Sequence, residues 1–182
     1  GGAIYSPGDP YDPLTITNTK FKKNISTGDG GAIHFGSYYT RVNIYNCIFS
    51  DNLSESGRGS AMFIGDMISN SQFNMSNSMF VNNPHTIYLD SYDQFRFSNN
   101  YFSDEESIIN GSSNVIVEMN NNYVNEAKVF ITALNIKNIF DGVTLSFVDQ
   151  ADGDYRLTST SGLIDAGSTD VVGITISPTD LN

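Results

Sequence analysis

The chain has 182 residues, which is long enough for one domain with a continuous core, and 39% of the residues are hydrophobic and can form that core. Nine Lys and Arg against 20 Asp and Glu give a formal net charge of −11, which disfavours nucleic acid and anionic membrane surfaces as partners. The single cysteine, Cys47, excludes an intramolecular disulfide, and no apolar run approaches the roughly 20 residues that membrane insertion requires.

The first element in chain order is a short word, Gly-Gly-Ala-Ile, that the chain uses more than once. It stands at Gly1, returns at Gly30 and has a looser copy, Gly-Ser-Ala-Met, at Gly59. A repeat of about 20 to 50 residues is typical of solenoids and arrays. Because the chain begins inside a repeat, the sequence predicts a fragment of a larger surface protein.

Each copy of this word opens a short predicted strand with an inward and an outward face. The inward column is Ile4, Ile33, Met62 and Ile87. The residues that follow them, expected to point outward, are Tyr5, His34, Phe63 and Tyr88. The residues that precede them, also expected to point outward, are Ala3, Ala32, Ala61 and Thr86. The alternation predicts an aromatic column on the outer surface.

A second phrase follows each strand after a variable stretch. Its copies are LTITNTKFKKN from Leu14, VNIYNCIFSDN from Val42, FNMSNSMFVNN from Phe73, FRFSNNYFSDE from Phe95 and, more weakly, IVEMNNNYVNE from Ile116. Apolar first and third positions predict another half-buried strand. The fifth position is always Asn (Asn18, Asn46, Asn77, Asn99 and Asn120), and the eighth is aromatic (Phe21, Phe49, Phe80, Phe102 and Tyr123). Asn at that place predicts a tight turn and an amide ladder.

Together these repeats predict an all-β protein, a right-handed parallel β-helix of about five to seven coils. We expect residues 1–182 to form a single domain, with clear repeats over 1–126 and irregular C-terminal coils over 127–182. The register is lost between residues 128 and 148.

The paired words Gly-Gly-Ala-Ile and Phe-x-x-Asn resemble the repeats of the polymorphic outer-membrane protein family and of related adhesin-like surface proteins. The second word occurs as FKKN at Phe21, FSDN at Phe49 and FVNN at Phe80, and is replaced by FSDE and YVNE in later copies. The segment DYRLTSTSGLIDAGS from Asp154 is similar to the closing region of secreted β-helix proteins that carry a surface anchor. The resemblance implies an extracellular or cell-surface location and a role in adhesion.

Two groups of aromatic residues are candidate ligand contacts. The outward column Tyr5, His34, Phe63 and Tyr88 could stack on sugar rings or anchor a partner's side chains. Tyr11, Tyr38 and Tyr39 lie in predicted loops, where tyrosine offers contact area at small entropic cost. The alternative is structural: the column stabilises itself as a ladder or packs under loops.

Acidic residues suggest weaker sites. Asp149, Asp152 and Asp154 are close enough in sequence to hold calcium, although their spacing does not follow a calcium loop and a turn explains them as well. No other cofactor is expected. Glycoside hydrolysis needs two carboxyl groups about 5 to 9.5 Å apart. Asp66 and Asp90, which end neighbouring predicted strands, are the nearest candidates for such a pair, although a turn explains them better. Cys47 is expected to be a small buried filler, and we predict no catalytic residues.

The sequence therefore predicts a non-enzymatic adhesin-like segment that binds a glycan, or a protein of a host or neighbouring cell, through its outer face and loops. The alternatives are a carbohydrate-active β-helix enzyme, either a polysaccharide lyase or a glycoside hydrolase, and a passive stalk.

Overall fold

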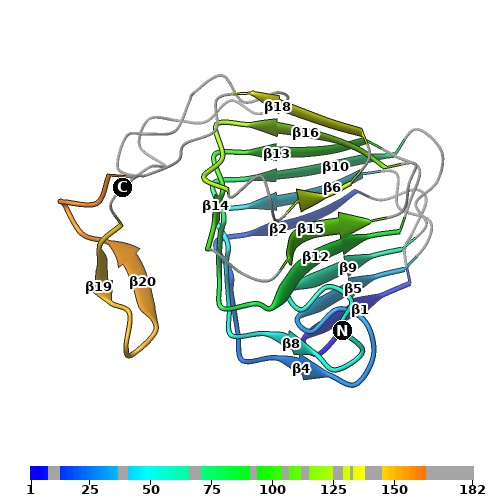
Figure 1. Cartoon of the computed structure of the whole chain (residues 1–182). Helices are drawn as coiled ribbons and strands as arrows, with labels where there is room; N and C mark the ends of the chain where they lie inside the picture. Colours follow the sequence, from blue (N-terminus) through cyan, green and yellow to red (C-terminus); the bar gives the residue numbers. More distant parts are fainter. Residues whose placement is uncertain are drawn as a thin grey trace.

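The computed structural model describes residues 1–7, 13–36, 41–65, 71–90, 94–103, 107–111, 115–124, 129–131, 133–137 and 145–162. Over these ranges the protein is all-β, and successive passes of the chain lay their strands side by side in parallel sheets (Figure 1). This arrangement is consistent with a parallel β-helix or solenoid, and one pass of the chain is called a coil below.

Three sheets form the body of the stack. The first contains, in spatial order, β1 (Ile4–Ser6), β5 (Ile33–Phe35), β9 (Met62–Ile64), β12 (His85–Leu89), β15 (Ser107–Gly111) and β17 (Val129–Phe130). The second contains β2 (Leu14–Thr17), β6 (Arg41–Tyr45), β10 (Gln72–Ser76), β13 (Gln94–Ser98), β16 (Ile116–Asn120) and β18 (Ala133–Lys137). The third contains β3 (Lys20–Lys22), β7 (Ile48–Ser50), β11 (Met79–Val81) and β14 (Tyr101–Phe102). A short two-stranded sheet pairs β4 (Ile25–Ser26) with β8 (Leu53–Ser54).

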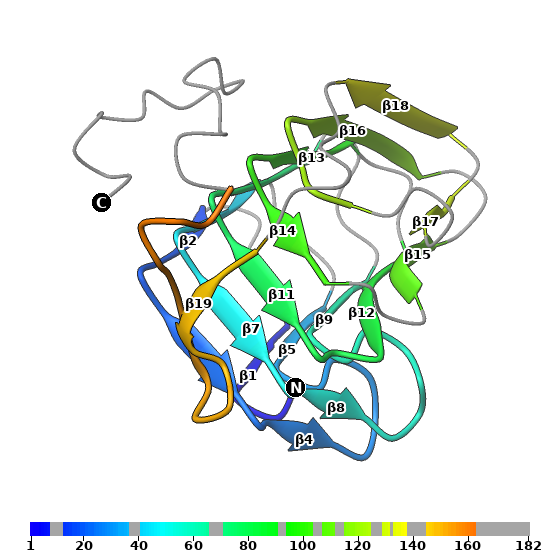
Figure 2. The ribbon, with the colours of Figure 1, turned by 60° about the vertical axis from the view of Figure 1, so that its left-hand side comes forward.

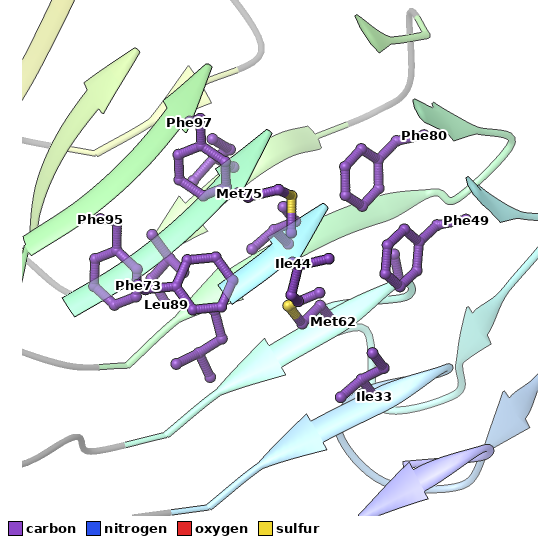
Figure 3. Packing of buried hydrophobic residues seen from close by; sticks show 14 of the residues in the cluster. Ile33, Ile44, Phe49, Met62, Phe73, Met75, Phe80, Leu89, Phe95 and Phe97 are labelled. Atoms are coloured by element: carbon purple, nitrogen blue, oxygen red, sulfur yellow. The ribbon is translucent and has the colours of Figure 1, made fainter. Parts of the chain in front are cut away.

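The core is built from equivalent side chains stacked coil on coil. Phe21, Phe49, Phe80 and Phe102 form one continuous column, with ring centroids 4.8 Å apart at each step and interplanar angles of 12°, 4° and 8°. Figure 3 shows Phe49 and Phe80 one above the other, with other buried apolar side chains beside them. Each such ring pair contributes about 0.5–1.5 kcal/mol beyond the burial of its area.

The turn between the second and third sheets uses the asparagine of the repeat. Asn18, Asn46, Asn77 and Asn99 have φ angles of 52°, 54°, 51° and 54°, a left-handed conformation that asparagine tolerates better than most residues. The side-chain oxygen of Asn77 is buried without a hydrogen-bond partner, so the expected amide ladder is not continuous through this column.

The fifth copy of the phrase lies one residue further along the chain than the sequence alignment placed it. Asn120 ends strand β16 opposite Ser98, and Asn121 takes the turn with φ 53°. Tyr123 correspondingly pairs with Tyr101 rather than with Phe102. Burial explains the shift, because Val117 is fully buried while Ile116 is 45% exposed.

The amide ladders lie in two columns, one just after the strands of the third sheet and one just before them. The Asn24 side chain donates to Asn52 Oδ1 at 2.9 Å, and the Asn52 side chain donates to Asn83 Oδ1 at 3.0 Å. Asn100 donates in the same way to Asn122 Oδ1 at 3.0 Å. All of these except Asn24 are at most 2% exposed, so the ladders satisfy polar groups within the interior.

The Gly-Gly-Ala-Ile word makes a sharp entry into the first sheet. Gly30 has φ 70°, and a Cβ atom there would lie 2.2 Å from the carbonyl oxygen of Ile33. Ala32 O then accepts hydrogen bonds from both Ala3 N and Ile4 N, at 2.9 and 3.0 Å. Because one carbonyl oxygen accepts from two consecutive N–H groups, the strict in–out alternation of side chains along the strand is interrupted at this point. The expectation that this column points outward was therefore wrong for Ala32, Ala61 and Thr86, which are at most 1% exposed, whereas Ala3 at the end of the stack is exposed.

A hairpin of β19 (Phe147–Asp149) and β20 (Asp154–Leu157) stands outside the third sheet (Figure 1 and Figure 2) and contacts it through side chains at two places. Phe147 contacts Tyr101 edge-on, with ring centroids 6.2 Å apart. At the other end of the hairpin, Lys22 Nζ donates to the carbonyl oxygen of Asp152 at 3.3 Å. The hairpin therefore spans several coils of this sheet.

Candidate functional site: an aromatic strip on the first sheet

The residues of the predicted aromatic column, Tyr5, His34, Phe63 and Tyr88, lie opposite one another on four neighbouring strands. The ring centroids are 5.1, 4.8 and 5.7 Å apart in that order. Only the Phe63–Tyr88 pair is close to parallel, at 9°, whereas the other two pairs are tilted by 57° and 46°. We call this row the aromatic strip.

The four rings are not equally accessible. Tyr5 is 65% exposed, and His34 and Tyr88 are half-buried. Phe63 is only 6% exposed, although its position is on the outer side of the strand. The part of the strip that a ligand can reach therefore consists of Tyr5 at one end and Tyr88 at the other, with His34 between.

Arg58 covers the middle of the strip. Its guanidinium carbon lies 5.1 Å from the centroid of Phe63 and 5.6 Å from that of Tyr88, within the range of a cation–π contact. The side chain of Arg58 is itself 48% exposed. A cationic group with accessible surface thus lies directly on the rings, and no pattern in the sequence indicated it.

Asp29 holds Arg58 in this place. Arg58 Nε donates to Asp29 Oδ1 at 2.8 Å, Nη2 donates to Oδ2, and Ser56 Oγ donates to Oδ1 at 2.9 Å. These hydrogen bonds raise the pKa of Arg58. His34 Nδ1 lies 3.3 Å from the carbonyl oxygen of the same Asp29, and burial lowers the pKa of His34, which keeps the imidazole neutral at pH 7.

The strip continues in register beyond Tyr88. Asn110 pairs with Tyr88, and Phe130 pairs with Asn110 and is 52% exposed. Phe130 was not predicted, because the repeat register of the sequence is lost just before it. Tyr11, Tyr38 and Tyr39, the other predicted contacts, lie outside the described residues.

The acidic residues near the C-terminus have local partners. Asp149 Oδ1 accepts from the backbone N–H of Asp152 across the β19–β20 turn, at 3.2 Å. Asp154 pairs with Arg156, whose hydrogen bonds lower the pKa of the carboxyl group to about 2. Within the described ranges, His, Cys, Asp and Glu side chains do not gather in groups of three or more that could hold a metal ion.

Two of the residues that were considered for catalysis are Cys47 and Asp66. Cys47 is 1% exposed, and burial raises the pKa of its thiol, which opposes the thiolate form that a nucleophile needs. Asp66, the predicted neighbour of Asp90, lies outside the described residues.

Comparison of the chain with protein-family models, with curated proteins and with solved structures gave no match. The described part of the chain also contains no helix with the length and apolar character needed to cross a membrane.

Proposed function

We propose that the protein is a non-enzymatic, adhesin-like segment displayed outside the cell, which binds a glycan or a cell-surface protein through the aromatic strip. In this proposal the stack is a right-handed β-helix of about five to seven coils, as in the repeat proteins that its sequence resembles.

The aromatic strip with Arg58 is the observation that carries this proposal. Tyrosine and arginine are the side chains that most often dominate binding energy at interfaces, since they offer a large rigid surface with polar groups at its edge. Here Tyr5 presents such a surface at 65% exposure, and Asp29 fixes Arg58 beside Tyr88 before any ligand arrives. Groups that are already held in place lose little entropy on binding.

A glycan array, an array of extracellular host proteins and a polysaccharide depolymerisation assay test the proposal together. We expect binding on one of the arrays and no release of new reducing ends or unsaturated products. Products of depolymerisation would support a carbohydrate-active enzyme instead, and no signal in any assay would support a passive stalk.

A double variant locates the binding on the strip. Tyr5→Ala with Tyr88→Ala should weaken affinity at least tenfold, since hot-spot truncations cost about 2 kcal/mol or more and about 1.4 kcal/mol corresponds to a factor of ten. Val148→Ala, which truncates a 51% exposed side chain on the hairpin, is the control and should bind normally. Unchanged affinity of the double variant, with an intact circular dichroism spectrum, would remove the strip from the proposal.

A further inference from the structure

The outer face of the second sheet carries a straight column of polar side chains. Thr15, Asn43, Asn74, Arg96 and Glu118 lie directly opposite one another on β2, β6, β10, β13 and β16. We call this row the polar column. Neighbouring strands are about 4.8 Å apart, so the column extends for about 19 Å along the stack.

The side chains of the polar column are already ordered by bonds to one another. Asn74 Nδ2 donates to Asn43 Oδ1 at 3.1 Å, and Arg96 Nε donates to Glu118 Oε2 at 3.0 Å. Arg96 also donates through Nη2 to Gln94 Oε1 at 2.9 Å. These contacts fix the side chains while leaving them partly accessible: Arg96 and Glu118 are 21% and 35% exposed.

This face differs in chemistry from the other two. The first sheet presents aromatic rings, and the hairpin β19–β20 contacts the third. The five side chains of the polar column include no apolar anchor of the kind that protein interfaces place at their centre, and Ile116, which is 45% exposed on the same face, lies at the β16 end of the column. The charges of Arg96 and Glu118 cancel. Arg41, beside the column on β6, adds one positive charge, but the chain as a whole carries −11, so a polyanion gains little from this surface.

We infer that the polar column binds a linear, uncharged polysaccharide laid along the axis of the stack. Each amide side chain offers a donor and an acceptor together, as does the Arg96–Glu118 pair, and sugar hydroxyl groups are donors and acceptors together. An extended pyranose chain advances by a distance close to one strand spacing per sugar. One sugar would therefore lie over each strand, and about five sugars would cover the column. The inference concerns a different face from the aromatic strip and does not depend on it.

Affinity electrophoresis tests this inference with hydroxyethylcellulose, glucomannan, galactomannan and neutral xylan in the gel, and with polygalacturonate as the anionic counterpart. We expect at least one neutral polymer to retard the protein and polygalacturonate to have no effect. For the polymer that binds, calorimetry with its oligosaccharides should show affinity that rises up to about five sugars and then levels off.

Variants on the two faces separate this inference from the proposed function. Asn43→Ala with Asn74→Ala should weaken binding of the neutral polymer at least tenfold, whereas Tyr5→Ala with Tyr88→Ala should leave it unchanged. Arg96→Lys, which keeps the charge and loses the planar guanidinium, should also weaken binding. This variant tests the inference if the double asparagine variant does not fold. Retardation by no neutral polymer, or retardation that only the strip variant abolishes, would overturn the inference.

Discussion

Replacing Asn52 with alanine tests the buried amide ladder. The Oδ1 atom of Asn52 accepts from the backbone and the side chain of Asn24, at 3.1 and 2.9 Å, and its Nδ2 donates to Phe21 O and Asn83 Oδ1, both at 3.0 Å. Asn52→Ala therefore removes four hydrogen bonds at a site with no solvent exposure. At about 0.5–1.5 kcal/mol each, with some recovered where Asn24 meets water, the loss is about 3 kcal/mol. For a chain of this length that lowers Tm by about 6–12 °C.

Asn74→Ala is the matched control, because it removes a similar bond between two asparagines, of 3.1 Å, on the half-buried outer face. It should cost about 0.5 kcal/mol. Urea unfolding followed by far-UV circular dichroism and by tyrosine fluorescence measures both variants, and agreement of the two probes checks for the partial unfolding that repeat proteins can show. Equal destabilisation by the two substitutions would refute the view that the buried ladder stabilises the stack.

Three further predictions follow from single residues. Gly30→Ala should destabilise the protein by more than 2 kcal/mol in the same urea assay, since its φ is 70° and a Cβ atom would meet Ile33 O, whereas Gly28→Ala, with nothing within 4 Å, should change little. The Cys47 thiol should react with iodoacetamide only as fast as the protein unfolds, and rapid labelling of the folded protein would contradict its burial. Asp154 should titrate by NMR with a pKa of about 2, and Arg156→Gln should raise that pKa toward the ordinary carboxyl range, because the guanidinium favours the ionised form.

The sequence predicted the parallel stacking because equivalent residues recur at every coil. The columns Tyr5–His34–Phe63–Tyr88 and Phe21–Phe49–Phe80–Phe102 lie in the structure as the aligned repeats placed them. What the sequence could not specify was the alignment of the fifth copy, where three consecutive asparagines, Asn120, Asn121 and Asn122, allow two registers. Burial of the strand decided between them.

Contacts between side chains from different parts of the repeat were beyond sequence reasoning. Arg58 precedes the third copy of the glycine word, and nothing in its own neighbourhood indicates that it covers Phe63 and pairs with Asp29. The asparagines of the ladders were visible as a recurring residue. Asn24, Asn52 and Asn83 directly follow the residues that turn, Lys23, Asp51 and Asn82, so the sequence alone does not separate a ladder residue from a turn residue.

Every assignment of an outer face depends on the strands pairing in the observed register, and cross-linking tests that register directly. In a Cys47→Ser background, cysteines placed at Asn43 and Asn74 should be bridged rapidly by dibromobimane, because these residues are directly paired on strands about 4.8 Å apart. Cysteines at Arg41 and Asn74 lie on the same two strands but are offset along them, at a separation of about 8 Å, and should be bridged far more slowly. Faster bridging of the Arg41–Asn74 pair would show a different register in the second sheet and would contradict the polar column.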